Sequence, residues 1–379
     1  MTEKFHIDLD KDCLDNDKNG MARLGVLQTA HGDVHTPVFM PVGTVGAMKA
    51  MHFDQLKKCG AEIMLCNTYH LMIQDRYETI AKMGGLHKFM NWDKPLLTDC
   101  GGFQAMSLCK LNKIKEQGVI FRCHLSGKKY DLSPEFSMEI QHKLDTNITM
   151  ALDECVRQPA DYNYTRKAML RSLRWAERSK KAYVERDGYG LFGIIQGAAD
   201  KDLRTQSIDG LKKIGFDGYA IGGDLSINDN WELMFSVLDW LTPMIPHDKP
   251  RYLMGVGKPI DIVGSVLRGV DMFDCVMPAR SGRTGQAFVR GGTLNIRNSK
   301  FTLDEKPLDN KCKCTACTQH TRAYIHHLFK SKELLGKMLL TEHNIMYYQD
   351  LMRGIRKAIK EKRYKQFAED FIAGKEVDY

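Results

Sequence analysis

The chain has 379 residues, 43% hydrophobic and 27% charged, which is enough material for a large globular core. The first ten residues lack the apolar stretch of a secretory leader, and no run reaches the roughly 18 apolar residues that span a membrane, so we expect a cytoplasmic protein with no membrane segment. Apart from one cluster near the carboxyl end, the eleven cysteines are irregularly spaced, which is typical of reduced thiols and not of a disulfide framework. The net charge of +8 is compatible with a polyanionic partner without indicating one.

The amino-terminal stretch, residues 1–36, does not fit the alternation of strands and helices that follows it. Within it, the segment GVLQTAHGDVHTP, which starts at Gly25, resembles a β-hairpin. A second segment outside the alternation is VIFRCHLSGKKYDLS, which starts at Val119 and has a Ser-Gly turn between two alternating stretches. We therefore expect amino-terminal β elements and one inserted hairpin.

Eight short apolar or β-branched runs, each ending in turn-forming residues, are predicted to be strands. They start at Pro37, Glu62, Leu96, Asn147, Gly190, Asp217, Arg251 and Met272. Between the fourth and fifth runs, Met169, Leu173 and Ala176 share one helical face in the segment from Thr165 to Arg186. Strands that alternate with helices and are apolar throughout predict a parallel (β/α)8 barrel, of class α/β. A doubly wound open sheet is the alternative, but the chain has no phosphate-binding glycine fingerprint.

Polar residues and glycines stand where these runs end, which is where a barrel carries its functional groups. They are Asn67, Asp99, Asp153, Gln196, Gly222, Gly223 and Asp274. Three carboxylates at one mouth suit chemistry at a glycosidic carbon, because one can attack, one can move protons and one can accept hydrogen bonds from a base. A lone strand-end Asp would more simply be a helix cap or a loop anchor.

The remaining residues of the predicted mouth suit recognition of a planar base on a polynucleotide. A buried Asp–Gln pair beside a glycine N–H matches the hydrogen-bonding edge of guanine. Phe103 offers a face for stacking and Met254 an opposite wall, although either side chain could equally be part of the core. Arg280 and Arg283 follow the last carboxylate in a glycine-containing loop and could clamp phosphates; a solvated basic loop is the alternative.

A cysteine cluster near the carboxyl end has the spacing of a metal site. Three thiolates, Cys312, Cys314 and Cys317, with one imidazole would make a closed tetrahedral zinc site, which leaves no open position for water activation. Spacing alone leaves the fourth ligand open among His320, His326, His327 and His343. Unmetallated cytosolic cysteines are the alternative. After the cluster, the segment from Arg353 has a basic helical pattern.

The motifs TDCGGFQAMSL, ALDEC, IIQG, YLMGVGKP, DMFDCVMPARSGR and CKCTACTQHTRAYIHHL together resemble the bacterial tRNA-guanine transglycosylase family over nearly the whole chain. The resemblance implies an irregular (β/α)8 barrel with an inserted zinc-binding subdomain, in a homodimer. We expect β elements over 1–36, the barrel and its terminal helices over 37–295 and 345–379, and the zinc subdomain over 296–344.

The family's reaction implies a role for each matching residue. Asp274 would be the nucleophile that attacks C1′ of the wobble ribose and expels guanine, and Asp99 would be the general acid/base. The residues that would bind the base are Asp153, Gln196, the backbone of Gly223, Phe103 and Met254. Arg280 and Arg283 would hold the tRNA anticodon loop. The residues matching the family's ligands for one structural Zn²⁺ are Cys312, Cys314, Cys317 and His343.

The incoming deazaguanine base is the open point. The chain departs from the family's pattern over residues 222–229, where Asp224 looks inserted and Asn228-Asp229 replace Gly-Glu. We expect 7-aminomethyl-7-deazaguanine (preQ1), because Cys155 looks bacterial and Ile227 is bulkier than the glycine of queuine-using members; queuine salvage is the alternative.

Three rival classes fit the sequence less well. A non-catalytic tRNA-binding paralogue would have lost the nucleophile, whereas Asp274, Asp99 and Asp153 are all present. An archaeal-type enzyme would carry extra carboxyl-terminal domains. A free nucleoside hydrolase would have little use for the arginine loop or the cysteine cluster.

Overall fold

Eight parallel strands form one sheet in the computed structural model, which describes residues 5–108, 112–223, 230–375, 377 and 379. In sheet order these are β4 (Val38–Pro41), β14 (Met272–Cys275), β13 (Arg251–Leu253), β12 (Gly218–Ile221), β11 (Gly190–Ile195), β10 (Ile148–Met150), β6 (Leu96–Thr98) and β5 (Met64–Cys66). The two ends of this order meet through a parallel bridge between Val42 and Leu65. The sheet is therefore closed, which confirms the predicted (β/α)8 barrel over the doubly wound alternative, and each predicted run holds one strand.

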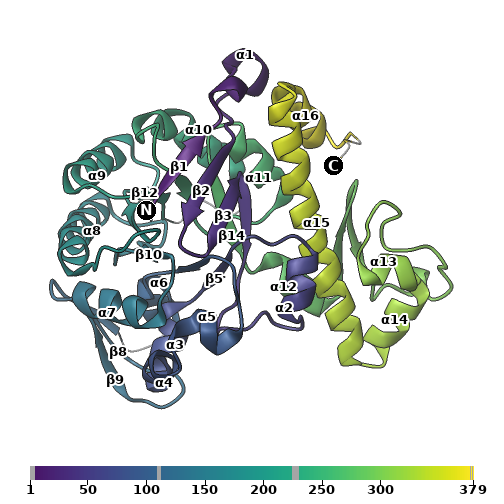
Figure 1. The fold of residues 1–379 in the computed structure, drawn as a ribbon, viewed down its shortest axis with the longest axis horizontal. Helices are drawn as coiled ribbons and strands as arrows, with labels where there is room; N and C mark the ends of the chain where they lie inside the picture. Colours follow the sequence, from purple (N-terminus) through teal and green to yellow (C-terminus); the bar gives the residue numbers. More distant parts are fainter. Residues whose placement is uncertain (1–4, 109–111, 224–229, 376, 378) are drawn as a thin grey trace.

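Helices follow the barrel strands and cover the outside of the sheet (Figure 1). They are α2 (Phe53–Lys58), α3 (Thr68–Met72), α4 (Arg76–Lys82), α5 (Gly85–Met90), α6 (Gly102–Leu108), α7 (Pro134–Leu144), α8 (Tyr162–Ala182), α9 (Lys201–Ile214), α10 (Trp231–Leu241), α11 (Pro259–Val266) and α12 (Met277–Thr284). The helix predicted between the fourth and fifth strands is α8, which begins after the N-cap Asp161 and buries Met169 and Ala176. Strands such as β4 and β11 are buried at every position, as expected for a sheet covered on both faces.

Two small antiparallel sheets confirm the predicted hairpins. The amino-terminal sheet consists of β1 (His6–Leu9), β2 (Gly25–Thr29) and β3 (Gly32–Thr36), and the inserted sheet of β7 (Asn112–Ile114), β8 (Val119–Arg122) and β9 (Lys129–Leu132). The first is anchored to the barrel by the buried Arg23, which donates to both carboxylate oxygens of Asp271 at 2.9 and 2.6 Å. Since Asp271 directly precedes β14, this ion pair lies at the amino-terminal end of the barrel, away from the mouth.

The carboxyl-terminal part packs against the barrel through one long helix. It comprises β15 (Gln286–Val289), β16 (Gly292–Asn295), α13 (Thr315–Gln319), α14 (Arg322–Lys330), α15 (Leu334–Lys360) and α16 (Tyr364–Ile372). Figure 1 shows α13 and α14 on the opposite side of α15 from α8 and α9. The basic pattern predicted from Arg353 falls in the end of α15 and in α16. The predicted domain limits at residues 36, 295 and 344 stay a prediction.

Short elements complete the described chain: α1 (Asn16–Asn19) and 3-10 turns at Lys11–Cys13, Ile73–Asp75, Thr242–Met244 and Ser299–Phe301. None of the helices in the described residues is both long and apolar enough to cross a membrane.

Candidate active site and metal centre

The predicted site residues stand at the carboxyl ends of neighbouring barrel strands. Asp99 directly follows β6, Gln196 directly follows β11 and Asp274 lies within β14. Because all these strands run parallel around a closed sheet, their carboxyl ends share one mouth. The contacts described next show which of these side chains meet.

Asp99 is a buried carboxylate held by several hydrogen-bond donors. Asn67 Nδ2 and Gln104 Nε2 donate to Oδ2 at 2.6 and 2.8 Å, and the backbone N–H of Thr68 donates to Oδ1 at 2.8 Å. Burial outweighs these donors and, with the nearby charge of Asp274, raises the pKa of Asp99 to about 6. A carboxyl that titrates this close to neutrality can both give and take a proton at working pH, as a general acid/base must.

Asp274 is partly exposed at the mouth, and its hydrogen bonds converge on one oxygen. Tyr252 Oη donates to Oδ1 at 2.6 Å, and the backbone N–H of Gly255 donates to the same atom at 2.8 Å. Desolvation raises the pKa of Asp274, and these two donors oppose the rise. Gly255 has φ +73°, and a Cβ there would meet no atom within 4 Å, so the left-handed backbone, and not crowding, favours glycine at this donor.

Asp153 and Gln196 form the buried polar pair that the sequence predicts. Gln196 Nε2 donates to Oδ2 of Asp153 at 2.6 Å, and Cys100 Sγ donates to Oδ1 at 3.2 Å. Burial raises the pKa of Asp153. Gly223 lies next to this pair, since a Cβ built on it would be 3.4 Å from Gln196 Oε1. The structure thus brings a carboxylate, an amide and a glycine backbone together at the mouth.

Arg204 supports this base-binding corner from α9 and was missed by sequence reasoning. The fully buried guanidinium donates to the carbonyl of Gly222 at 2.8 Å and also to those of Ile195 and Ala198. It thereby ties the loop after β11 to the end of β12. Burial lowers the pKa of Arg204 to about 9. Nothing in the sequence distinguishes Arg204 from the surface arginines of the other helices.

The predicted stacking and phosphate-binding residues occupy accessible positions. Phe103 is 42% exposed at the start of α6, and Met254 is partly buried directly after β13. Phe103 also lines a hollow of about 250 Å³ together with Cys155. Whether Phe103 and Met254 sandwich a base stays a prediction. Residues Asp224, Ile227, Asn228 and Asp229, on which the choice of incoming base was argued, lie outside the described residues.

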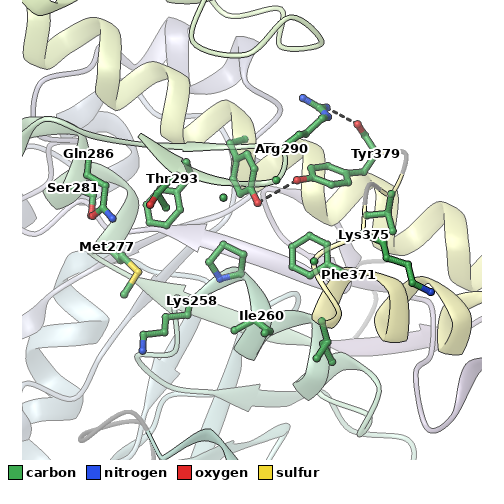
Figure 2. A pocket seen from close by; sticks show the side chains of 18 residues that line it. Lys258, Ile260, Met277, Ser281, Gln286, Arg290, Thr293, Phe371, Lys375 and Tyr379 are labelled. Carbon is green, nitrogen blue, oxygen red and sulfur yellow. Dashed lines mark hydrogen bonds between the residues drawn. The ribbon is translucent and has the colours of Figure 1, made fainter. Parts of the chain in front are cut away.

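The arginine loop predicted after Asp274 forms the short helix α12. Arg280 is exposed there, and burial together with the neighbouring Arg280 charge lowers the pKa of Arg283. Two residues of α12 border a pocket of about 580 Å³, shown in Figure 2, between the β15–β16 hairpin, α11 and the end of the chain. Its lining includes Met277, Ser281 and the cationic Lys258. Cationic groups therefore lie on α12 and in the pocket beside it.

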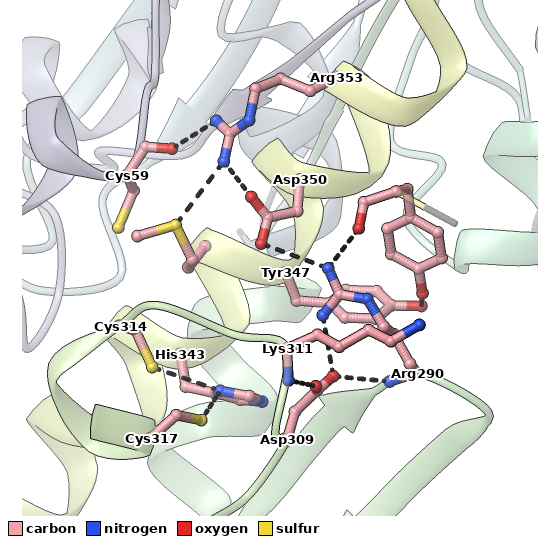
Figure 3. Close-up of polar contacts among 12 residues, drawn as sticks. Cys59, Arg290, Asp309, Lys311, Cys314, Cys317, His343, Tyr347, Asp350 and Arg353 are labelled. Atoms are coloured by element: carbon pink, nitrogen blue, oxygen red, sulfur yellow. Dashed lines mark hydrogen bonds and ion pairs between the residues drawn. The ribbon is translucent and has the colours of Figure 1, made fainter. Parts of the chain in front are cut away.

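Three cysteines and one histidine form a group that could hold a metal ion. Figure 3 shows two of the cysteines, Cys314 and Cys317, beside the ring of His343. The ligand atoms of Cys312, Cys314, Cys317 and His343 all lie within 4.8 Å of one another. His343 Nδ1 is 3.5 Å from Cys314 Sγ and 3.3 Å from Cys317 Sγ, while Nε2 donates to the carbonyl of Phe288 at 2.7 Å. That bond leaves Nδ1 unprotonated and directed at the thiols, the usual arrangement of a metal-ligating histidine.

The competing histidines are placed differently. His326 is buried and bonds through Nδ1 to the carbonyl of Ile296 at 2.7 Å, and His327 is exposed. Among the described residues, His343 is the candidate whose ring nitrogen lies with the three cysteine sulfurs, so it completes the cluster. The three thiols and one imidazole are the donor set of a closed tetrahedral site and fit a structural metal ion.

Glu342 links this centre to the barrel and was not predicted from the sequence. Its Oε1 accepts from the backbone N–H and the hydroxyl of Thr315 at 3.0 and 2.8 Å, and its Oε2 accepts from Gln55 Nε2 at 3.2 Å. Thr315 follows the ligand Cys314, whereas Gln55 belongs to α2 beside the barrel. Figure 3 also shows an ion pair within the carboxyl-terminal part, in which Arg290, directly after β15, pairs with Asp309 at 3.1 Å.

Comparisons with known proteins agree with the resemblance found in the motifs. A family model described as Queuine tRNA-ribosyltransferase matches residues 17–376. A protein of that name from Rickettsia typhi is 58% identical over 339 residues, which is 89% of this chain and 94% of the relative. One from Cereibacter sphaeroides is 52% identical over 375 residues, 99% of this chain and 98% of the relative. One from Granulibacter bethesdensis is 54% identical over 351 residues, 93% of each chain.

Proposed function

The chain belongs to the queuine tRNA-ribosyltransferase family of pentosyltransferases, and on that premise we propose that it exchanges guanine at the anticodon wobble position by double displacement. Its substrates are the tRNAs for aspartate, asparagine, histidine and tyrosine, in the pathway to queuosine. The observation that carries the proposal is that two carboxylates in different surroundings interact at the mouth. Asp274 is partly exposed and Asp99 is buried, and the charge of Asp274 contributes to the raised pKa of Asp99. Two carboxylates in different surroundings can divide the attack and the proton transfer.

In the first half of the reaction, a carboxylate oxygen of Asp274 attacks C1′ of the wobble ribose. The bond from C1′ to guanine breaks, a covalent aspartyl-ribosyl intermediate forms, and Asp99 gives its proton to the departing base. In the second half, the incoming base returns a proton to Asp99 and attacks C1′, which releases Asp274. One glycosidic bond replaces another, so no nucleoside triphosphate is consumed.

The buried pair of Asp153 and Gln196 reads the base. Asp153 accepts from the N1–H and the exocyclic amine of guanine, while the second amide N–H of Gln196 and the backbone N–H of Gly223 donate to its carbonyl. Phe103 and Met254 enclose the ring. The 2.6 Å bond between Gln196 and Asp153 supports this role, because it fixes both side chains before a base arrives.

The cationic face around α12 binds the anticodon loop. Arg280 and Arg283 contact its phosphates, and Lys258 in the pocket beside the helix extends the positive surface. The chain acts as a homodimer, for which light scattering at the assay concentration is the direct test.

Cys312, Cys314, Cys317 and His343 hold one Zn²⁺ per subunit. Bound there, the ion would stabilise the fold of the segment between β16 and α15, and a set of four protein ligands would suit a structural rather than a catalytic role. The residues that perform the exchange are thus the mouth carboxylates, while the metal centre shapes the surface beside them.

The incoming base is preQ1, with queuine as the alternative. Cys155 and Ile227 favour the smaller base, although Ile227 lies outside the described residues. The test loads tRNA with radiolabelled guanine and measures its release by each base alone. Faster release with preQ1 supports the proposal, faster release with queuine reverses the choice of base, and release with neither favours the non-catalytic tRNA-binding paralogue.

A further inference from the structure

The hydrogen bonds of Asp274 distinguish its two oxygens. We propose that Tyr252 is a positioning residue that, together with the backbone N–H of Gly255, fixes Oδ1 of Asp274 and leaves Oδ2 as the attacking atom. The proposal rests on the nucleophilic role of Asp274 described above. It goes beyond that role by naming the reacting oxygen and the side chain that selects it.

The strand register places the tyrosine for this task. Tyr252 on β13 pairs with Met272 on the adjacent β14, two residues before Asp274. Successive side chains of a strand alternate between its faces, so Met272 and Asp274 point to the same side of β14. The Tyr252 ring is fully buried, and its hydroxyl donates to Oδ1 at 2.6 Å. A donor held by a packed ring loses little freedom when it binds, so it orients the carboxylate firmly.

Two donors on one oxygen have a chemical consequence. Oδ1 accepts from both Tyr252 and Gly255, so its lone pairs are engaged and it is the poorer nucleophile. The hydrogen bonds described for this carboxylate leave the lone pairs of Oδ2 available for C1′. The same two bonds stabilise the carboxylate that a departing ribosyl group must leave behind in the second half of the reaction.

The charged and titratable groups around Asp274 affect its ionisation, and the two hydrogen-bond donors act against their effect. The groups that act on Asp274 or beside it are Asp99 directly after β6, Tyr252 on β13, Cys275 on β14 and Arg280, whose charge acts on Cys275. The charge of Asp274 contributes to the raised pKa of Asp99, so the two carboxyls interact across the mouth. Burial and the adjacent carboxylate raise the pKa of Tyr252 far above its usual range, so its hydroxyl stays a donor. The two donors on Asp274 therefore favour its ionised form.

The test compares Tyr252→Phe with the matched variant Tyr364→Phe. Tyr364 is also fully buried and donates its hydroxyl to a backbone carbonyl, that of Val263 at 2.8 Å, far from the mouth in the packing of α16 against α11. We expect Tyr252→Phe to slow formation of the covalent tRNA adduct about 10- to 100-fold at saturating tRNA, the effect of losing one hydrogen bond to a charged group. The KM for tRNA should stay within about two-fold, since tRNA contacts are intact.

The pH profile of adduct formation distinguishes a positioning role of Tyr252 from a role in core packing alone. Without the tyrosine donor Asp274 ionises less readily, so the acidic limb of adduct formation should move to higher pH in Tyr252→Phe and stay in place in Tyr364→Phe. A wild-type rate and profile in Tyr252→Phe would overturn the proposal. Equal slowing of both tyrosine variants would also overturn it, because that would reflect a general loss of core packing.

A second measurement does not depend on the reaction. In a double-mutant cycle of Tyr252→Phe with Asp274→Ala, unfolding in denaturant at neutral pH should show coupling between the two residues, and the coupling should diminish as acid protonates Asp274. Additive effects of the two substitutions on the free energy of unfolding at every pH would overturn the proposal that Tyr252 holds Asp274 by a hydrogen bond. If the wild-type protein forms no adduct while the double-mutant cycle shows coupling between Tyr252 and Asp274, the proposed function fails. The hydrogen bond from Tyr252 to Asp274 is then still supported.

Discussion

The amide of Gln196 donates to the carboxylate of Asp153 at 2.6 Å across the boundary between two adjacent barrel strands, although the residues are 43 positions apart. The pair is buried, so its carboxylate has lost most of its contact with water. A base that enters can therefore donate the hydrogen bonds that water no longer supplies to this carboxylate, as expected of a selective polar pocket.

Replacing the acceptor of this pair should impair base binding specifically. Asp153→Asn presents an amide where a guanine N–H must be accepted, so we expect the KM for radiolabelled guanine to rise about 10- to 100-fold. Asp202→Asn, an exposed change in the first turn of α9, is the matched control and should leave the KM unchanged. An unaltered KM in Asp153→Asn would contradict the assigned role.

Arg204 should matter for both stability and base recognition. Arg204→Met removes donors to three carbonyls in a fully buried setting, and we expect it to lower the free energy of unfolding by about 2 to 5 kcal/mol and to raise the KM for guanine. Denaturant unfolding and guanine exchange at a temperature where the variant is folded measure the two effects. Arg174→Met, which removes a half-exposed ion pair with Glu116, should cost less than about 1 kcal/mol. Equal losses from both variants would contradict the bridging role.

The zinc content of the protein should depend on His343 and not on the exposed His327. We expect about one zinc ion per chain by elemental analysis, lost in His343→Ala because the fourth ligand is gone and retained in His327→Ala. Chelation of the wild-type protein should lower its melting temperature, since the ion organises the segment between β16 and α15. Equal metal content in the two variants would show that another residue completes the site.

The two halves of the reaction should respond to pH in opposite ways around the titration of Asp99. Burial, reinforced by Asp274, raises the pKa of Asp99 to about 6, so its protonated form declines as pH rises through that value. Guanine release in a single turnover uses the protonated form and should slow above about pH 6. Consumption of the adduct by an incoming base uses the ionised form and should slow below it. Rapid-quench measurements at several pH values would contradict the assignment if both steps were flat.

The sequence alone predicted the frame of this molecule well, for physical reasons. Buried strands must be apolar and must end in turn residues, so eight such runs specified the barrel, and parallel closure then placed Asp99 and Asp274 at one mouth. The short spacing of Cys312, Cys314 and Cys317 likewise indicated a metal site.

The supporting residues could not be found this way. Tyr252 looks like any inward-facing residue of an apolar strand, and Arg204 like any arginine of an amphipathic helix. Their partners, Asp274 and the carbonyl of Gly222, are fixed by how neighbouring strands and helices pack. His343 could not be chosen by spacing, because the ring orientation set by the carbonyl of Phe288 decides which histidine faces the thiols.

The most direct test of the account is to trap the covalent intermediate. Wild-type protein and Asp274→Asn are each incubated with a wobble-guanine tRNA and a guanine analogue that stalls the second half of the reaction, and the products are separated on denaturing gels. We predict a protein–tRNA band with the wild-type chain that Asp274→Asn abolishes, because an amide oxygen is a far weaker nucleophile than a carboxylate. An adduct of equal yield with Asp274→Asn would contradict the central claim that Asp274 attacks the ribose.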